Sequence, residues 1–166
     1  MKPKNYSSPP YSFLHITIIL LMKVEDRFEI QELISKLAYT HDTLDYEGYR
    51  DLYTEDLLRS NTFKDAEAEY RQGRDISVGA TLDRLKMLRE QGIVDRHYYL
   101  NPILEEISDD EVKGVVSFLI VAQQGEETRP SLVNSGLVDL VFRRTDKGWR
   151  VAQFHIKFDI PDPRPK

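Results

Sequence analysis

The sequence has 166 residues, of which 40% are hydrophobic and 31% charged, and its formal net charge is −5. This length and composition fit one globular domain. The acidic balance argues against a nucleic-acid partner, because such binding needs clustered Lys and Arg. The absence of cysteine excludes disulfides, thiolate metal sites, iron–sulfur clusters and cysteine nucleophiles. It is also compatible with the cytoplasm, where we expect the protein to act.

Residues 1–22 differ from the rest of the chain. A Ser/Pro/Tyr stretch leads into an apolar run from Phe13 to Met22, which is shorter than the ~18–20 residues of a membrane-spanning helix. A basic start before such a run resembles a signal peptide, but no small-residue cleavage site follows. We expect a disordered or loosely docked N-terminal extension and no membrane partner, with translation from Met22 as an alternative.

Three helices are predicted from the spacing of apolar residues. The first covers about residues 23–40. Its apolar stripe consists of Val24, Phe28, Leu33, Ile34 and Leu37. Asp45 is placed to cap a second, short helix over residues 46–53, and a third helix begins at Asp75 and ends at Gly92.

The remaining segments show the alternation and turn residues of strands. Strands are expected over residues 56–63, 66–71, 95–107, 112–123, 132–143 and 149–159. Helices followed by turn-linked strands are typical of an α+β fold in which helices pack on one face of an antiparallel sheet. A strongly curved sheet would leave a concave pocket against the helices. We therefore expect one domain over residues 23–160 and a Pro-rich tail over residues 161–166.

A first polar cluster follows the first predicted helix. Extending the apolar stripe by another turn brings His41 or Asp42 near the buried face. Burial there would raise the pKa of a carboxylate towards a value that suits a general base. The alternative is that Asp42 and Asp45 cap the helix junction and that His41 is an exposed cation at the helix C-terminus.

A second polar cluster lies in the strand after the third helix. On a strand, His97, Tyr99 and Asn101 share one face. Hydrogen-bonding side chains in a row are poor core material unless their face lines a polar pocket. The alternative is a solvated face, with Tyr98 and Leu100 in the core.

His155 lies in the last predicted strand and faces either a pocket or the surface; we favour the pocket. The sequence has no Gly-rich phosphate loop, nucleophile elbow or His-Glu-x-x-His zinc motif. His41-Asp42 is similar to the His-Asp pair of metal phosphohydrolases. Those proteins need further helical His ligands, whereas His97 lies in a strand region, so we expect no metal.

Four sequence features occur together in an order that is specific for one family. They are Ile30-Gln-Glu-Leu33 with Asp42 twelve residues after Ile30, Asp45-x-x-x-Tyr49-x-x-Leu52-Tyr53-x-x-Asp56, Arg96-His97-x-x-x-Asn101, and Gly148-Trp149-Arg150-Val151 followed by Asp159. Over about residues 24–159 the sequence resembles the SnoaL-like branch of the nuclear-transport-factor-two-like superfamily. Members include polyketide cyclases, scytalone dehydratase and hexachlorocyclohexane dehydrochlorinase.

The resemblance implies a cone-shaped α+β barrel, in which a curved antiparallel sheet wraps around three helices and encloses a mostly apolar cavity. It also implies a catalytic pair, because the dehydrochlorinase has its catalytic Asp and His at the positions of Asp42 and His97. His97 would be the general base that removes a carbon-bound proton. Asp42 would orient the imidazole and stabilise the imidazolium. Substrate contacts are expected from Tyr39, Tyr53, Tyr99, Asn101 and His155.

The sequence departs from the family pattern in two strands. The family often has Gly-x-Tyr-x-Asp, whereas here Gly136 is followed by Val138 and Leu140. His155 lies where the closing strand often carries a basic pair. These changes affect the expected substrate contacts, and His155 and Tyr39 are candidates to act instead as acid or hydroxyl donors.

Taken together, these features predict a lyase or isomerase without a cofactor, of the dehydratase, dehydrohalogenase or cyclase type. Its substrate would be small and largely apolar, aromatic or polyketide-like, with a proton α to an activating group. Two alternatives stay open: a non-catalytic ligand-binding or accessory protein, and the small subunit of an aromatic-ring-hydroxylating dioxygenase. A homodimer or homotrimer is expected in either case, because the sheet face opposite the helices must be covered.

Overall fold

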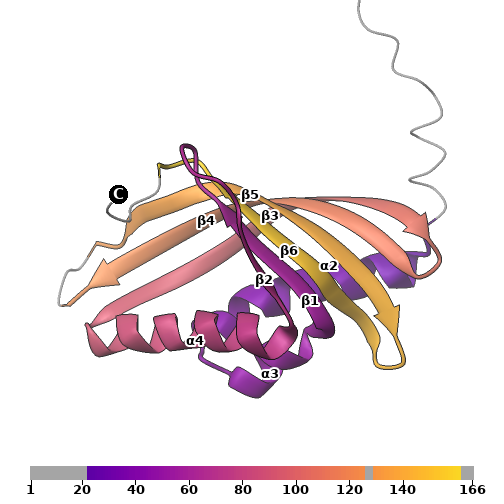
Figure 1. Cartoon of the computed structure of the whole chain (residues 1–166), viewed down its shortest axis with the longest axis horizontal. Coiled ribbons are helices and arrows are strands. Elements are labelled where there is room, and N and C mark those ends of the chain that lie inside the picture. Colours follow the sequence, from indigo (N-terminus) through magenta and orange to yellow (C-terminus); the bar gives the residue numbers. More distant parts are fainter. Residues whose placement is uncertain (1–21, 126–128, 162–166) are drawn as a thin grey trace, which may run out of the picture.

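The computed structural model describes residues 22–125 and 129–161. The predicted extension over residues 1–22, apart from Met22, and the predicted tail over residues 161–166, apart from Pro161, lie outside this part. The elements, labelled as in Figure 1, are α2 (Val24–Asp42), α3 (Tyr46–Asp51), β1 (Tyr53–Thr62), β2 (Glu69–Gln72), α4 (Arg74–Glu90), β3 (Ile93–Ser108), β4 (Glu111–Gln124), β5 (Ser131–Thr145) and β6 (Gly148–Phe158). Among the described residues, no helix has both the length and the apolar character needed to cross a membrane.

The strands form one sheet of six strands in the order β2-β1-β6-β5-β4-β3. Four neighbouring pairs are antiparallel, but β1 and β6 run parallel. The expectation of a purely antiparallel sheet was therefore wrong at this pair. The reason is connectivity: most of the chain separates β1 from β6, so no hairpin forces them to run in opposite directions.

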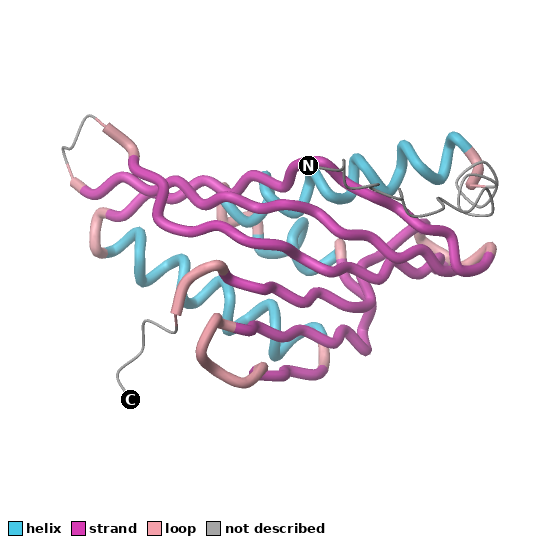
Figure 2. Tube along the Cα trace, turned by 90° about the horizontal axis from the view of Figure 1, so that it is seen from above, coloured by secondary structure: helices cyan, strands magenta, loops and turns pink. Residues whose placement is uncertain are grey.

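The sheet is curved and open, and the helices lie on its concave side (Figure 1). Helix α2 packs on β3 and β6, and α4 packs mainly on β1. The strands cover the helices when the molecule is seen from above (Figure 2). The predicted α+β class, with helices on one face of a curved sheet, is confirmed.

The second helix begins where the sequence predicted and ends earlier. Asp45 is its N-cap, and its carboxylate accepts a hydrogen bond from the Gly48 backbone N–H at 3.0 Å. The helix stops at Asp51 because Tyr53 already pairs with Val151 of β6. Strand β1 therefore starts before residue 56, where the pattern had placed it.

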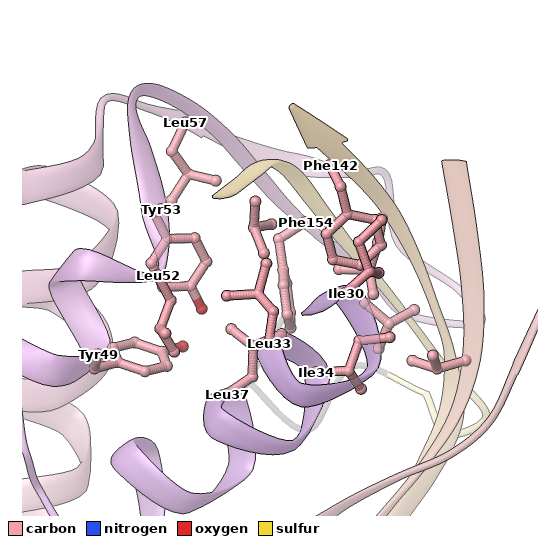
Figure 3. Close-up of a cluster of buried hydrophobic side chains, with 14 of the residues drawn as sticks. Ile30, Leu33, Ile34, Leu37, Tyr49, Leu52, Tyr53, Leu57, Phe142 and Phe154 are labelled. Atoms are coloured by element: carbon pink, nitrogen blue, oxygen red, sulfur yellow. The ribbon is translucent and has the colours of Figure 1, made fainter. Parts of the chain in front are cut away.

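The core lies between α2 and the sheet (Figure 3). Ile30, Leu33, Ile34 and Leu37 on α2 are all buried, in the phase that the sequence indicated. Val24 and Phe28 are exposed, contrary to the prediction. The first turns of α2 instead dock through polar contacts on another side of the helix. These are Trp149 Nε1 to Asp26 Oδ1 at 3.1 Å, Arg144 Nη2 to Asp26 Oδ2 at 2.8 Å, and Trp149 N to Glu29 Oε1 at 3.0 Å.

Candidate active site

Asp42 and His97 come from different elements and meet inside the concave side of the fold. The Nδ1 atom of His97 lies 2.7 Å from Asp42 Oδ1, and the backbone N–H of His97 donates to Asp42 Oδ2 at 3.0 Å. The side chain of His97 is 11% exposed and that of Asp42 is 10% exposed. Both carboxylate oxygens are thus engaged by one residue of β3, which fixes the direction of the imidazole.

The end of α2 is what places Asp42 there. The apolar stripe that runs through Ile34 and Leu37 continues into Thr40 and His41, which are buried too. Asp42 is the last helical residue, and Leu44 at φ 58 turns the chain away towards α3. Arg89 of α4 donates to the Asp42 backbone carbonyl at 3.0 Å, which ties a third element to the same point.

A second imidazole, that of His41, lies next to both Asp42 and His97. Its ring centroid lies 4.0 Å from that of His97 in an edge-on arrangement, and its Nδ1 is 3.5 Å from Asp42 Oδ1. Burial, the largest influence, lowers the pKa of His41 to about 4, although the neighbouring Asp42 opposes this. His41 is therefore neutral near pH 7, and it adds no positive charge beside His97.

Asp42 is ionised in this setting. Burial by itself raises the pKa of its carboxyl, but hydrogen bonds from His41, from the His97 ring and from the His97 backbone hold it well below its usual range. A carboxylate accepts hydrogen bonds but cannot donate them. The Nδ1 of His97 must therefore carry the proton, and in neutral His97 the lone pair is on Nε2.

The same side chains also satisfy the basic geometry of a cation site. One ligand atom each from His41, Asp42 and His97 lie within 4.8 Å of one another. Two imidazoles and a carboxylate are a donor set that transition metals accept. The sequence had led us to expect no metal, because it did not indicate that His41 and His97 meet.

Aromatic rings and one cation continue the site towards β1. Tyr49 packs on His41 with ring centroids 5.4 Å apart, and Tyr53 packs on Tyr49 at 5.1 Å. Their hydroxyl ends point towards α2 rather than towards solvent (Figure 3). Arg59 Nη1 donates to Tyr49 Oη at 3.0 Å, and its guanidinium carbon lies 4.7 Å from the centre of the Phe154 ring.

Two of the expected substrate contacts lie in this interior, and Tyr39 does not. Tyr53 is 2% exposed within the core, and Tyr99 packs against Phe154 with centroids 6.1 Å apart. Tyr39 is 68% exposed. It follows the buried Leu37 by two residues, which turns it to the outer side of the helix.

Asn101 also lies away from the pair, because β3 is irregular at this point. Asn101 has φ 54, and the pairing with β4 shifts between Leu100 and Ile103. Alternation therefore fails beyond Tyr99: Ile103 is 71% exposed, whereas Leu104 is 4% exposed. The alternative interpretation, with Tyr98 and Leu100 in the core, was wrong as well, since both are exposed.

His155 lies on the opposite, convex face of the sheet. Its Nδ1 contacts the hydroxyl of Ser60, and its Nε2 lies 3.4 Å from the hydroxyl of Thr62. Burial lowers the pKa of His155. It borders a hollow of about 250 Å³ together with Ser60, Tyr70 and Asp139. His155 thus borders a hollow, as favoured from the sequence, but on the other face of the sheet from His97, because its neighbour Phe154 faces the core.

Sequence reasoning missed Tyr49 and Arg59 as members of this interior cluster, and it left His41 as either a buried neighbour or an exposed cation. Tyr49 and His41 are aromatic residues with polar atoms, and each lies on the buried, apolar face of its helix. Arg59 lies two residues after Leu57, which is 0% exposed, and shares its face of β1. The signal that could have identified Arg59 is a cationic residue at a position that alternation places on the buried face of the strand.

With this geometry established, comparison with known proteins identifies the family. The family model of the SnoaL-like domain matches residues 22–155. The chain belongs to the SnoaL-like family. The resemblance inferred from the sequence is therefore confirmed, and the SnoaL-like domain covers all the elements that build the site.

Solved structures with the nuclear-transport-factor-two-like fold are similar to this SnoaL-like chain. ActVI-ORFA from Streptomyces coelicolor has a TM-score of 0.73 at 19% identity, covering 85% of this chain and 100% of that chain. A nuclear-transport-factor-two-like protein with a cystatin-like fold from Novosphingobium aromaticivorans has a TM-score of 0.67 at 19% identity, covering 93% and 95%. The beta subunit of the benzoate 1,2-dioxygenase from Burkholderia mallei has a TM-score of 0.68 at 15% identity, covering 83% and 93%. At these identities the likeness shows the fold alone. No curated protein matches the sequence significantly.

Proposed function

We propose that this SnoaL-like domain is a lyase or isomerase that needs no cofactor and uses His97 as a general base. The observation that carries the proposal is the double contact of Asp42 with His97, through the ring Nδ1 at 2.7 Å and the backbone N–H at 3.0 Å. This arrangement holds one tautomer and leaves Nε2 free to accept a proton.

The proposed step is removal of a proton from a carbon next to an activating group. The proton moves to His97 Nε2, and the electron pair of the broken C–H bond forms a double bond. In an elimination, a β leaving group departs with the electron pair of its own bond. In an isomerisation, His97 returns the proton to another carbon, and the double bond is shifted. The imidazolium that forms is stabilised by the adjacent Asp42 carboxylate. Neutral His41 avoids a second positive charge next to it.

The test is proton exchange and elimination in a panel of small aryl ketones with β-hydroxy or β-chloro substituents, followed by NMR in D₂O. Replacing His97 by Gln removes the base, and general-base catalysis contributes roughly 10²–10⁴-fold, so a rate loss of that size is expected. Asp42→Asn keeps the shape of the side chain but no longer holds the His97 proton on Nδ1. We therefore expect a large loss of rate in this variant too. His155→Gln on the convex face is the matched control and should be unchanged.

Two outcomes would contradict the proposal. One is that His97→Gln and the wild type convert a substrate at the same rate. The other is that a chelator abolishes the rate and added Zn²⁺ restores it, which would assign His41, Asp42 and His97 to a metal site. We expect the rate to survive chelation.

A non-catalytic role is the second candidate. The likeness to a dioxygenase beta subunit, with 93% of that chain covered, supports a subunit role. The hollow of about 250 Å³ on the convex face and a second hollow of about 140 Å³, beside the start of α2, are not lined by Asp42 or His97. This agrees with a protein that binds without turnover. Co-purification with an iron-bearing large subunit, or binding without conversion, would favour this second candidate.

A further inference from the structure

Arg59 is a buried cation without a buried anion beside it. The residue is 7% exposed, and its main neighbours are tyrosines. Within residues 22–125 and 129–161, no carboxylate forms an ion pair with its guanidinium. An unpaired charge in a protein interior is strongly unfavourable, so a folded chain retains one only where something compensates it.

The guanidinium of Arg59 has two contacts within the protein and one N–H group without a hydrogen-bond partner. Nη1 donates to Tyr49 Oη at 3.0 Å, and the Phe154 ring lies under the guanidinium plane at 4.7 Å. Nε is buried and has no hydrogen-bond partner. A donor left open on a fixed, planar cation is the geometry that binds a carboxylate edge-on.

The surrounding polar groups do not provide the missing negative charge. Burial raises the pKa of Tyr53 and of Tyr99, so both phenols stay neutral. The Tyr53 hydroxyl and Asn61 Oδ1 are also buried without partners. Asn61 follows Arg59 by two residues on β1 and shares its face. None of these neutral groups therefore compensates the charge of Arg59.

Two chains of ring contacts connect Arg59 to the Asp42–His97 pair. Along one, Tyr49 accepts from Arg59 and packs on His41, whose ring lies 4.0 Å from that of His97. Along the other, Tyr99 on the inward face of β3 packs on Phe154, which lies under Arg59. The base and the cation thus belong to one continuous set of contacting side chains.

We propose that Arg59 binds the anionic oxygens of the substrate, and that this substrate is a small carboxylate with an aromatic or unsaturated body. The permanent charge of Arg59 favours a ligand that is already anionic when it binds, rather than a neutral, wholly apolar one. Phe154 and the tyrosine rings provide flat surface for the body of the ligand. The role of the anion in turnover rests on the proposed function of His97, whereas its binding does not.

The experiment measures equilibrium binding of phenylacetate and of the neutral phenylacetamide by calorimetry. We expect the wild type to bind phenylacetate at least tenfold more tightly. Arg59→Met keeps the apolar stem and removes the charge, so the preference should disappear. Arg143→Met, at an exposed pair with Asp56, is the control and should keep the preference.

Two results would overturn the inference. They are equal binding of the two probes by the wild type and a preference that survives Arg59→Met. His97→Gln separates the two proposals. A carboxylate preference retained in that variant supports the anion site even if the base proves wrong. A preference that survives Arg59→Met, while His97 is still needed for turnover, contradicts the anion site alone.

Discussion

His41 shows how far burial determines the behaviour of a single side chain. The sequence left it as either a buried neighbour of the site or an exposed cation at a helix end. The structure buries it to 6% exposure between Tyr49 and His97, where its pKa falls to about 4. At this scale the charge state of the site depends on packing, because the same residue in water would titrate near 6.5.

The pH dependence of stability follows from this pKa. The folded-state value lies below the unfolded one, so the unfolded chain binds the proton more readily. The free energy of unfolding should therefore fall as the pH drops from about 6.5 to about 4, by on the order of 3 kcal/mol at most. Loss of the ionised form of Asp42, whose pKa is also lowered, adds a further decrease below about pH 4.

Urea denaturation at several pH values checks this prediction. His41→Gln should lack the decrease between pH 6.5 and 4 and keep the one at lower pH. If the free energy of unfolding changes with pH in the same way for the wild type and the variant between pH 6.5 and 4, His41 titrates normally in the folded protein, and the prediction is wrong.

At the scale of elements, β5 has exchanged a polar pattern for an apolar one. At the positions where the family pattern named in the sequence analysis has Tyr and Asp, Val138 and Leu140 are 0% and 2% exposed and belong to the core. The polar lining instead comes from β1 through Arg59. Gly136 keeps a separate role, since β5 and β6 approach closely there.

Two glycine substitutions test this close approach. A Cβ at Gly136 would lie 2.0 Å from the Lys157 carbonyl oxygen and 2.7 Å from Phe118, both fixed parts of the sheet and core. Gly136→Ala should therefore lower the free energy of unfolding by roughly 1–3 kcal/mol. In α4, nothing other than the chain neighbours and the backbone of the helix itself lies within 4 Å of a methyl added at Gly79, so Gly79→Ala should raise the free energy of unfolding by roughly 0.5–1 kcal/mol. Urea titration of both variants measures the difference, and equal effects would contradict the explanation.

At the scale of the whole molecule, the convex face of the sheet carries exposed apolar side chains. Tyr98, Leu100, Val115 and Leu137 are 47%, 40%, 37% and 45% exposed. Cross-strand pairs place them together, since Ser117 pairs with both Leu100 and Leu137. We call these four residues the convex patch. Exposed apolar side chains grouped on one face are typical of an interface.

We propose that two copies associate through the convex patch. Leu137→Asp should then shift the protein to a monomer in sedimentation velocity, because a charge would be buried without a partner. Ile76→Asp is the control, since Ile76 is 67% exposed on α4, on the helical side. A wild-type protein that sediments as a monomer, or a dimer unaffected by Leu137→Asp, would refute the proposal.

The sequence alone determined the local features of this protein. Apolar spacing predicted α2 and α4, Asp45 was identified as the cap of α3, and the order of motifs identified the family. These succeed because they depend on neighbours in the chain. Position within its own element placed each of Asp42 and His97 in a polar cluster, and the family resemblance predicted them as a pair.

Only the tertiary structure decided which of these residues meet. The parallel pairing of β1 with β6, the irregular turn of β3 at Asn101 and the outward side of Tyr39 all depend on packing between distant segments. They move Asn101, Tyr39 and His155 away from the pair and bring His41, Tyr49 and Arg59 towards it. Burial then sets the charges, since a histidine is neutral and an arginine uncompensated only in the interior that the sheet and helices enclose together.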